Sequence, residues 1–151
     1  LPMKDLQPIR PKESFSLVYK FAMEYHPSKG QTDEYWKELV EALGTYSKDN
    51  NPLNSCLLIA IFNYYEDIYK NHSPKVSQDD HFNLEFKKAL SFSLWAFEND
   101  VVFEDGIDPL KVSKSPTPML KALLSGFQKY YQTYQKNLKE NKLKNKGAIL
   151  L

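Results

Sequence analysis

Cysteine, arginine and glycine are all scarce in this sequence of 151 residues. It has one cysteine and 5 glycines, and Arg10 is the only arginine among 20 basic residues. A single cysteine cannot form a disulfide within the chain, so the fold must depend on packing, and we expect a reducing compartment, intracellular and cytoplasmic. With so few glycines and no Gly-x-Gly-x-x-Gly or Walker-type pattern, a backbone cradle for phosphate is not expected.

Long apolar runs are absent as well. The longest uninterrupted run extends from Cys56 to Phe62, whereas a helix that crosses a membrane needs about 20 predominantly apolar residues. No segment combines a basic start, an apolar centre and a small-residue cleavage site, which is the pattern of a signal peptide. The sequence therefore predicts no membrane span.

A large excess of one charge is also missing, because the formal net charge is +1. Proteins that bind nucleic acids neutralise many phosphates and use arginine for bidentate contacts, and neither feature is present here. The charge is nevertheless uneven, with an acidic stretch at 98–108 and a lysine-rich stretch at 136–146. Solvated surface is the simpler interpretation of both stretches. The second also defines a candidate basic patch, made of Lys136, Lys139, Lys142, Lys144 and Lys146.

Aromatic residues, in contrast, are abundant. They make up 14% of the chain, with 10 tyrosines and 9 phenylalanines, which is far more apolar surface than a disordered chain carries. Apolar residues recur at helical spacing in five segments. The sequence therefore predicts an all-α, single-domain bundle of about five helices over 14–138. Residues 1–13 are expected to be an extended lead-in, with 1–2 as a tag remnant, and 139–151 a basic tail with an apolar end.

The segment at about 53–69 is predicted to be the central helix. Asn51 can cap it, and Pro52 suits the first helical position, where its missing N–H costs nothing. Residues 53–62 are apolar on almost every side, which is typical of a helix surrounded by protein. We therefore expect the other helices to wrap this one completely.

The remaining helices are placed by their capping signals and apolar stripes. The first is expected to begin at Ser14 and to end near Tyr25, and the second to begin at Thr32. A capping box at Ser77 predicts the start of the fourth, and Thr117 with the following proline that of the fifth. The predicted stripes of the second and fourth helices are Trp36, Leu39, Val40, Leu43 and Tyr46, and Phe82, Phe86, Leu90, Leu94 and Phe97.

The fifth helix is expected to carry a stripe from Leu120 to Leu138, and Gly147 could stop a helix. Between the fourth and fifth helices, residues 99–116 read as one irregular loop, and a loop of this length is often functional. Val101–Phe103 followed by Asp105-Gly106 fits a very small β-hairpin, because Asp-Gly suits the tight turn that joins two strands.

No pattern predicts a catalytic, cofactor or metal site. Cys56 lies in the most apolar segment, where burial disfavours the reactive thiolate, so a core role is expected. Metal-ligand residue types occur at 72–81, without the spacing of a zinc site, and the acidic stretch lacks the closing glutamate of an EF-hand. We therefore expect no catalytic residue, no cofactor and no metal.

Two tyrosine clusters and the apolar end form the candidate interaction surface. Tyrosine buries its ring and leaves its hydroxyl wet, so such clusters suit either the half-buried seam of a bundle or a protein–protein patch. The residues concerned are Tyr64, Tyr65, Tyr69, Tyr130, Tyr131, Tyr134, Ile149, Leu150 and Leu151.

The functional hypothesis from the sequence is a non-catalytic helical protein–protein interaction or adaptor protein. Its partner would be another protein or a second copy of the chain. One alternative is a small nucleic-acid-associated accessory protein of phage or mobile-element type, which would use the lysine-rich tail. A second alternative is an enzyme of unrecognised type.

Overall fold

The architecture is a bundle of α-helices. The computed structural model describes residues 10–27, 32–48, 51–70 and 81–150, and for His81 and 141–150 it describes the backbone alone. These ranges contain five α-helices, one short 3-10 helix and no strand, which confirms the predicted all-α, single-domain fold. The elements are α1 (Pro11–Glu24), α2 (Asp33–Tyr46), α3 (Pro52–Lys70), α4 (His81–Glu98), η2 (Pro109–Lys111) and α5 (Pro118–Leu150).

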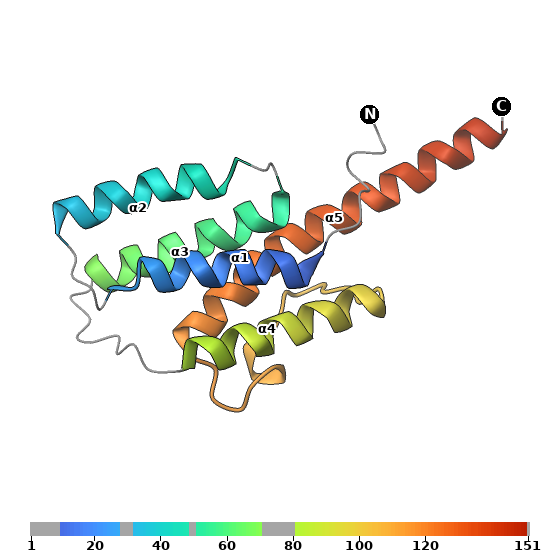
Figure 1. Cartoon of the computed structure of the whole chain (residues 1–151). Helices are drawn as coiled ribbons and strands as arrows, with labels where there is room; N and C mark the ends of the chain where they lie inside the picture. Colours follow the sequence, from blue (N-terminus) through green and yellow to red (C-terminus); the bar gives the residue numbers. More distant parts are fainter. Residues whose placement is uncertain (1–9, 28–31, 49–50, 71–80, 151) are drawn as a thin grey trace.

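Two helices form the middle of the bundle. α1 and α3 run side by side, α2 lies along one side of this pair, α4 lies along the other, and α5 crosses them obliquely (Figure 1). α1 and α2 are antiparallel, as are α2 and α3, which the short connections predicted. The most extensive contact between two helices is that of α3 with α5. Among the described helices, none has both the length and the hydropathy that a bilayer crossing requires.

The helix starts show which capping signals operate. Thr32, Asn51 and Thr117 each accept backbone N–H groups of the turn that follows, at N···O distances of 3.0–3.2 Å. These three predicted starts are confirmed, whereas the predicted capping box at Ser77 lies outside the described residues. The prediction that Ser14 caps α1 is wrong, because α1 already begins at Pro11 and Ser14 is buried inside it. Proline at the first helical position starts α1 without a side-chain cap.

α3 supplies the centre of the core, but the other helices do not wrap it completely. Leu53, Leu57, Leu58 and Ile61 are all 0% exposed. Ile59 on the opposite side is 46% exposed, which corrects the prediction that this helix is covered on every side. α1 and α5 cover two sides of α3, and the flank that carries Ile59 lies outside both contacts.

Two of the predicted apolar stripes are also corrected. Val40 is 54% exposed, because α2 buries only a narrow face containing Leu39 and Ala42. Leu94 is 43% exposed, although Phe82 and Phe86 are buried as predicted. On an α-helix, a step of four residues turns about 400° around the axis, which is one full turn plus about 40°. A series of residues at this spacing therefore moves around the helix by about 40° at each step and leaves the buried face. The small residues Ala89, Ser93 and Ala96 occupy that face instead.

α5 is longer than the sequence indicated. Its predicted stripe is confirmed by the buried Leu120, Leu123, Leu124 and Phe127. The helix then continues through Gly147 to Leu150, so the prediction that Gly147 ends it is wrong. Glycine inside a helix costs only about 1 kcal/mol relative to alanine, and the lysines around it are good helix formers. The expected tail at 139–151 is therefore, up to Leu150, the last part of α5, which projects beyond the other helices (Figure 1).

Candidate functional site

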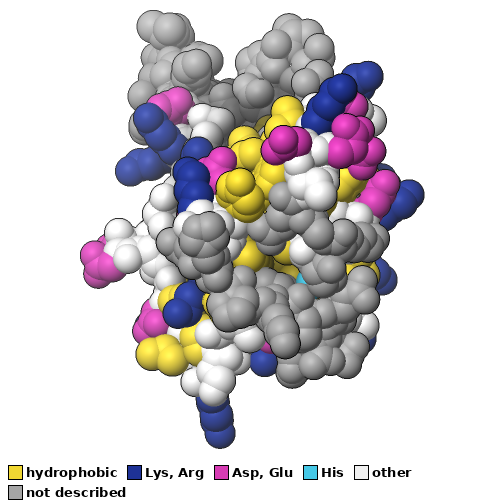
Figure 2. Space-filling model, turned by 90° about the vertical axis from the view of Figure 1, so that its left-hand side faces the viewer, with side chains coloured by type: hydrophobic (Ala, Val, Ile, Leu, Met, Phe, Trp, Pro, Cys, Tyr) yellow, Lys and Arg dark blue, Asp and Glu magenta, His cyan; other side chains and the backbone are white. Residues whose placement is uncertain are grey.

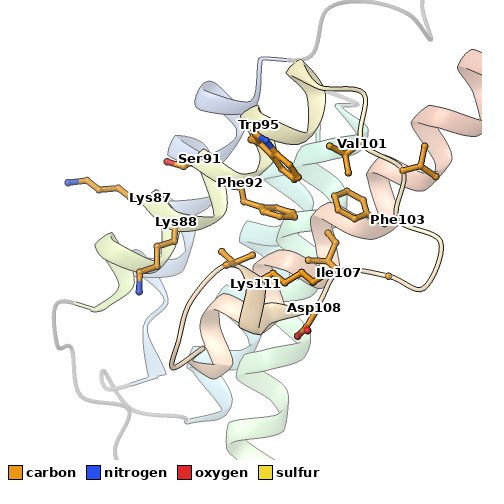
Figure 3. A pocket seen from close by; sticks show the side chains of 13 residues that line it. Lys87, Lys88, Ser91, Phe92, Trp95, Val101, Phe103, Ile107, Asp108 and Lys111 are labelled. Carbon is orange, nitrogen blue, oxygen red and sulfur yellow. The ribbon is translucent and has the colours of Figure 1, made fainter.

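A groove of about 700 Å³ lies between α4 and the segment that joins α4 to α5. This segment, residues 99–117, is called the α4–α5 connection below. Figure 3 shows the groove, with α4 as one wall and the connection as the other. The connection contributes residues of 101–112, and α4 contributes Lys87, Lys88, Ser91, Phe92 and Trp95.

The interior of the groove is aromatic and aliphatic. The half-buried ring of Phe92 lies 5.6 Å from the ring of Trp95 and 5.6 Å from that of Phe103, measured between centroids. Trp95 on α4 and Val102 on the connection remain 48% and 68% exposed. Large apolar side chains that surround a concave surface and stay exposed are typical of a binding site.

Two glutamines of α5 hold the connection in place, and a tyrosine between them in sequence holds the end of α4. We call these three side chains the α5 clamp: Gln128, Tyr131 and Gln135. Gln128 Oε1 accepts the backbone N–H of Ile107 at 2.8 Å, and Gln135 Nε2 donates to the carbonyl oxygen of Val101 at 2.7 Å. Between them, the Tyr131 hydroxyl donates to a backbone carbonyl in the last turn of α4 at 2.9 Å. Positions separated by three, four and seven residues share one face of a helix, so a single stripe of α5 fixes this wall of the groove.

A C-terminal cap on α4 sets the direction in which the chain enters the connection. The N–H of Val101 bonds to the carbonyl of Ala96 at 3.1 Å, and that of Asp100 to the carbonyl of Phe97 at 3.4 Å. This pair of bonds is the Schellman arrangement, which requires a left-handed residue just after the helix. Asp100 takes this position with a φ of +48°.

The predicted hairpin at 101–106 does not form. The described connection contains bends and the short helix η2, and Val101 to Phe103 pair with no strand. Gly106 does adopt the left-handed region, with a φ of +88°, so the turn signal itself was informative. A Cβ on Gly106 would lie 3.0 Å from Gln128 Oε1, so the backbone approaches the clamp too closely for a side chain. The extended segment packs against helices because the clamp satisfies its backbone groups.

The charges around the groove are unequal. Lys87, Lys88 and Lys111 line it, and Asp108 is the only acidic residue in the described lining. The Asp108 carboxylate accepts the N–H of Leu110 at 3.0 Å, where it caps η2. Lys88 Nζ donates to the hydroxyl of Ser113 at 3.1 Å, so its hydrogen-bond partner is a neutral group.

Three residues of the predicted interaction surface belong to the core instead. Tyr65, Tyr130 and Tyr131 are 0%, 6% and 1% exposed, so their rings cannot contact a partner, which corrects the surface interpretation for them. Burial raises the pKa of all three phenols, that of Tyr131 to about 12. The hydroxyl of Tyr65 donates to the carbonyl oxygen of Ala22, so this ring joins α3 to α1.

The other described tyrosines of the predicted surface do not line the groove. Tyr64 and Tyr134 are half-buried, and Tyr69 is 47% exposed with its ring 5.3 Å from that of Trp36. Ile149 and Leu150 lie in the last turn of α5, on its projecting part (Figure 1). Their side chains and Leu151 are outside the described part of the chain.

The candidate basic patch is only partly described. Lys136 and Lys139 are exposed on α5. Lys142, Lys144 and Lys146 belong to the same helix, but their side chains lie outside the described part. On the end of the bundle shown in Figure 2, basic and acidic side chains are interspersed, with small apolar areas between them. The described side chains on that face therefore do not separate into a basic and an acidic area.

The described residues contain no group of three histidine, cysteine or acidic side chains that could hold a metal ion. The metal-ligand residue types at 72–80 are outside the described ranges. Cys56 is half-buried, and burial raises the pKa of its thiol while nearby Lys129 lowers it, so desolvation dominates. A raised thiol pKa reduces the thiolate that a nucleophile or metal ligand needs.

Sequence reasoning selected the loop at 99–116 but missed what fixes it. Phe92 does not belong to the apolar stripe predicted for the fourth helix, and Trp95 is only adjacent in sequence to a residue of that stripe. Gln128 and Gln135 carry a signal that was available, because they lie seven residues apart and flank an aromatic residue on the apolar face of α5. An amide at such a position needs a hydrogen-bond partner when it is buried.

Comparison with protein-family models, curated proteins and solved structures finds no significant match to this chain.

Proposed function

We propose that this protein is a non-catalytic binding protein that docks a segment of another protein in the groove between α4 and the α4–α5 connection. The observation that carries the proposal is Trp95, which stays 48% exposed at the edge of a groove that already contains the aromatic rings of Phe92 and Phe103. Tryptophan in such a place is among the residues that contribute most binding energy at protein interfaces.

The groove is also preformed in the free chain. The α5 clamp holds the connection through Ile107 and Val101, so the wall opposite α4 is fixed by hydrogen bonds to a long helix. A preformed site costs less ordering entropy on binding than a loop that must first become ordered. This supports a docking role for the connection.

The polar groups of the groove favour binding over catalysis. The charged and hydroxyl side chains of its described lining are three lysines, Ser91 and one aspartate, and the aspartate already caps η2. General acid–base or nucleophilic chemistry needs a proton acceptor within reach of a reacting group. The lysines can orient an anionic group without such chemistry.

The test uses a library of random peptides displayed on phage and selected on the complete chain. The binding of the enriched peptides is then measured against Trp95→Ala and Leu94→Ala. Leu94 is the matched control, because it is an exposed apolar residue next to Trp95 that does not line the groove. Truncation of a tryptophan that anchors a partner costs about 2 kcal/mol or more, which corresponds to an approximately thirty-fold loss of affinity.

We expect this loss for Trp95→Ala and unchanged binding for Leu94→Ala. Peptides that bind both variants as tightly as the original chain would contradict docking in the groove. Oligonucleotide binding that depends on Lys136 and Lys139 and not on Trp95 would favour the nucleic-acid alternative.

A further inference from the structure

We propose that the groove selects an acidic partner segment, in which a bulky apolar side chain is followed at a short distance by carboxylates. The apolar side chain would enter between Phe92, Trp95 and Phe103, and the carboxylates would contact Lys87, Lys88 and Lys111. This inference rests on the proposed docking function and adds the chemistry of the partner.

In the described lining of the groove, three lysines accompany a single acidic residue, Asp108, so positive charge is in excess there. Neither of the ion pairs seen in the described part of the chain, Arg10–Glu13 and Lys70–Glu66, includes a residue of the groove. Lys88 bonds to a hydroxyl, and the one aspartate of the lining is engaged as a cap. The lysines therefore attract an anionic group from outside the chain.

Charge is also distributed in order along the groove. Lys87 and Lys88 precede Phe92 and Trp95 on α4, and Lys111 lies on the facing wall (Figure 3). Beyond the aromatic end, acidic residues at 98–105 are exposed. They repel a carboxylate there, so a negatively charged segment is attracted to one end of the groove and excluded from the other.

The positions of the lysines and aromatic residues on α4 also set the expected distance between the apolar anchor of the partner and its acidic residues. Four residues separate Lys88 from Phe92 and eight separate Lys87 from Trp95, which correspond to about 6 and 12 Å along the helix axis. An extended peptide advances about 3.3 Å per residue. The acidic residues of the partner should therefore lie about two to four positions from the apolar anchor.

The experiment continues from peptides whose binding depends on Trp95. Their sequences should be enriched in Asp and Glu about two to four positions from a large apolar residue. Synthetic copies are then measured by fluorescence anisotropy against Lys111→Ala and Lys114→Ala. Both substitutions remove one positive charge from the connection, but Lys114 does not line the groove and serves as the control.

We expect Lys111→Ala to weaken binding about three- to five-fold and the Lys87→Ala/Lys111→Ala double variant about ten-fold, with little effect of Lys114→Ala. The difference should disappear for peptides whose acids are replaced by amides. Peptides that depend on Trp95 but show no acidic enrichment and the same affinity for Lys111→Ala would overturn this inference and leave the docking function intact. Failure to obtain any Trp95-dependent peptide would overturn the docking function itself.

Discussion

Replacing Gly126 by alanine should destabilise the protein, although alanine is the better helix former. Gly126 lies where α5 crosses α3, and a Cβ there would be 2.9 Å from the carbonyl oxygen of Cys56, 3.0 Å from Cβ of Ala60 and 3.2 Å from Cα of Leu57. Carbon atoms pack best at about 3.5–4.0 Å. Two of these three atoms belong to the backbone of α3, so a rotamer change cannot relieve the contact, and the helices must separate.

The magnitude follows from two opposing effects. Alanine gains about 1 kcal/mol over glycine in a helix interior, whereas overpacking a close contact costs about 1–3 kcal/mol after relaxation. The rigid backbone of α3 puts Gly126→Ala at the costly end, so we expect a net loss of about 1–2 kcal/mol. Gly44 on α2 is the control, because a Cβ at that position would meet no neighbouring atom within 4 Å. Gly44→Ala should therefore gain about 0.5–1 kcal/mol.

Urea unfolding of the original chain and both variants, followed by circular dichroism, measures these changes. Thermal unfolding gives the corresponding change in Tm. In a protein of this size 1 kcal/mol shifts Tm by about 2–4 °C, so the two variants should move Tm in opposite directions. If Gly126→Ala stabilises the protein as much as Gly44→Ala does, α3 and α5 do not cross at the distance described above.

Three other predictions concern the connection and the buried tyrosines. Asp100→Gly should raise the free energy of unfolding by about 1 kcal/mol, because glycine adopts a positive φ without strain, and an unchanged urea midpoint would argue against the left-handed cap. Gln128→Ala should cost about 1–3 kcal/mol by leaving a backbone N–H unsatisfied, while the exposed Gln132→Ala changes little in the same assay. Because burial raises the pKa of Tyr65 above the ordinary 10.0 and that of Tyr131 to about 12, the unfolded chain releases these protons first. Stability should therefore fall between about pH 10 and 12, by up to about 1.4 kcal/mol per pH unit for each such tyrosine, and a constant unfolding free energy over this range would refute the assignment.

The sequence was sufficient to predict the helices, because their signals are local. Thr32, Asn51 and Thr117 bond within the turn that follows them, and the stripe of α5 records a single packed face. The predictions were wrong where the burial of an apolar residue depends on the position of a neighbouring helix and not on the local sequence pattern. Ile59 and Leu94 are apolar and were expected to be buried, but among the described residues they remain 46% and 43% exposed, which only the arrangement of the bundle decides.

The groove was harder to predict because it is made from separated parts of the chain. Phe92 and Phe103 come from a helix and from a segment without strands, and Gln128 lies a further helix away. Each has an ordinary local role in the sequence. Their common function depends on hydrogen bonds over 21 and 34 residues, to Ile107 and Val101, and no periodicity reports such contacts.

The α5 clamp also changes how a segment without regular structure should behave over long times. The Ile107 amide is part-buried and donates to a side chain of α5, so its hydrogen can reach solvent only when the connection detaches from that helix. Its exchange with deuterated solvent should consequently follow the detachment of the connection from α5 and not the fast rate usual for loops. Slowly exchanging amide hydrogens in the connection would therefore identify the residues through which it is bound to α5.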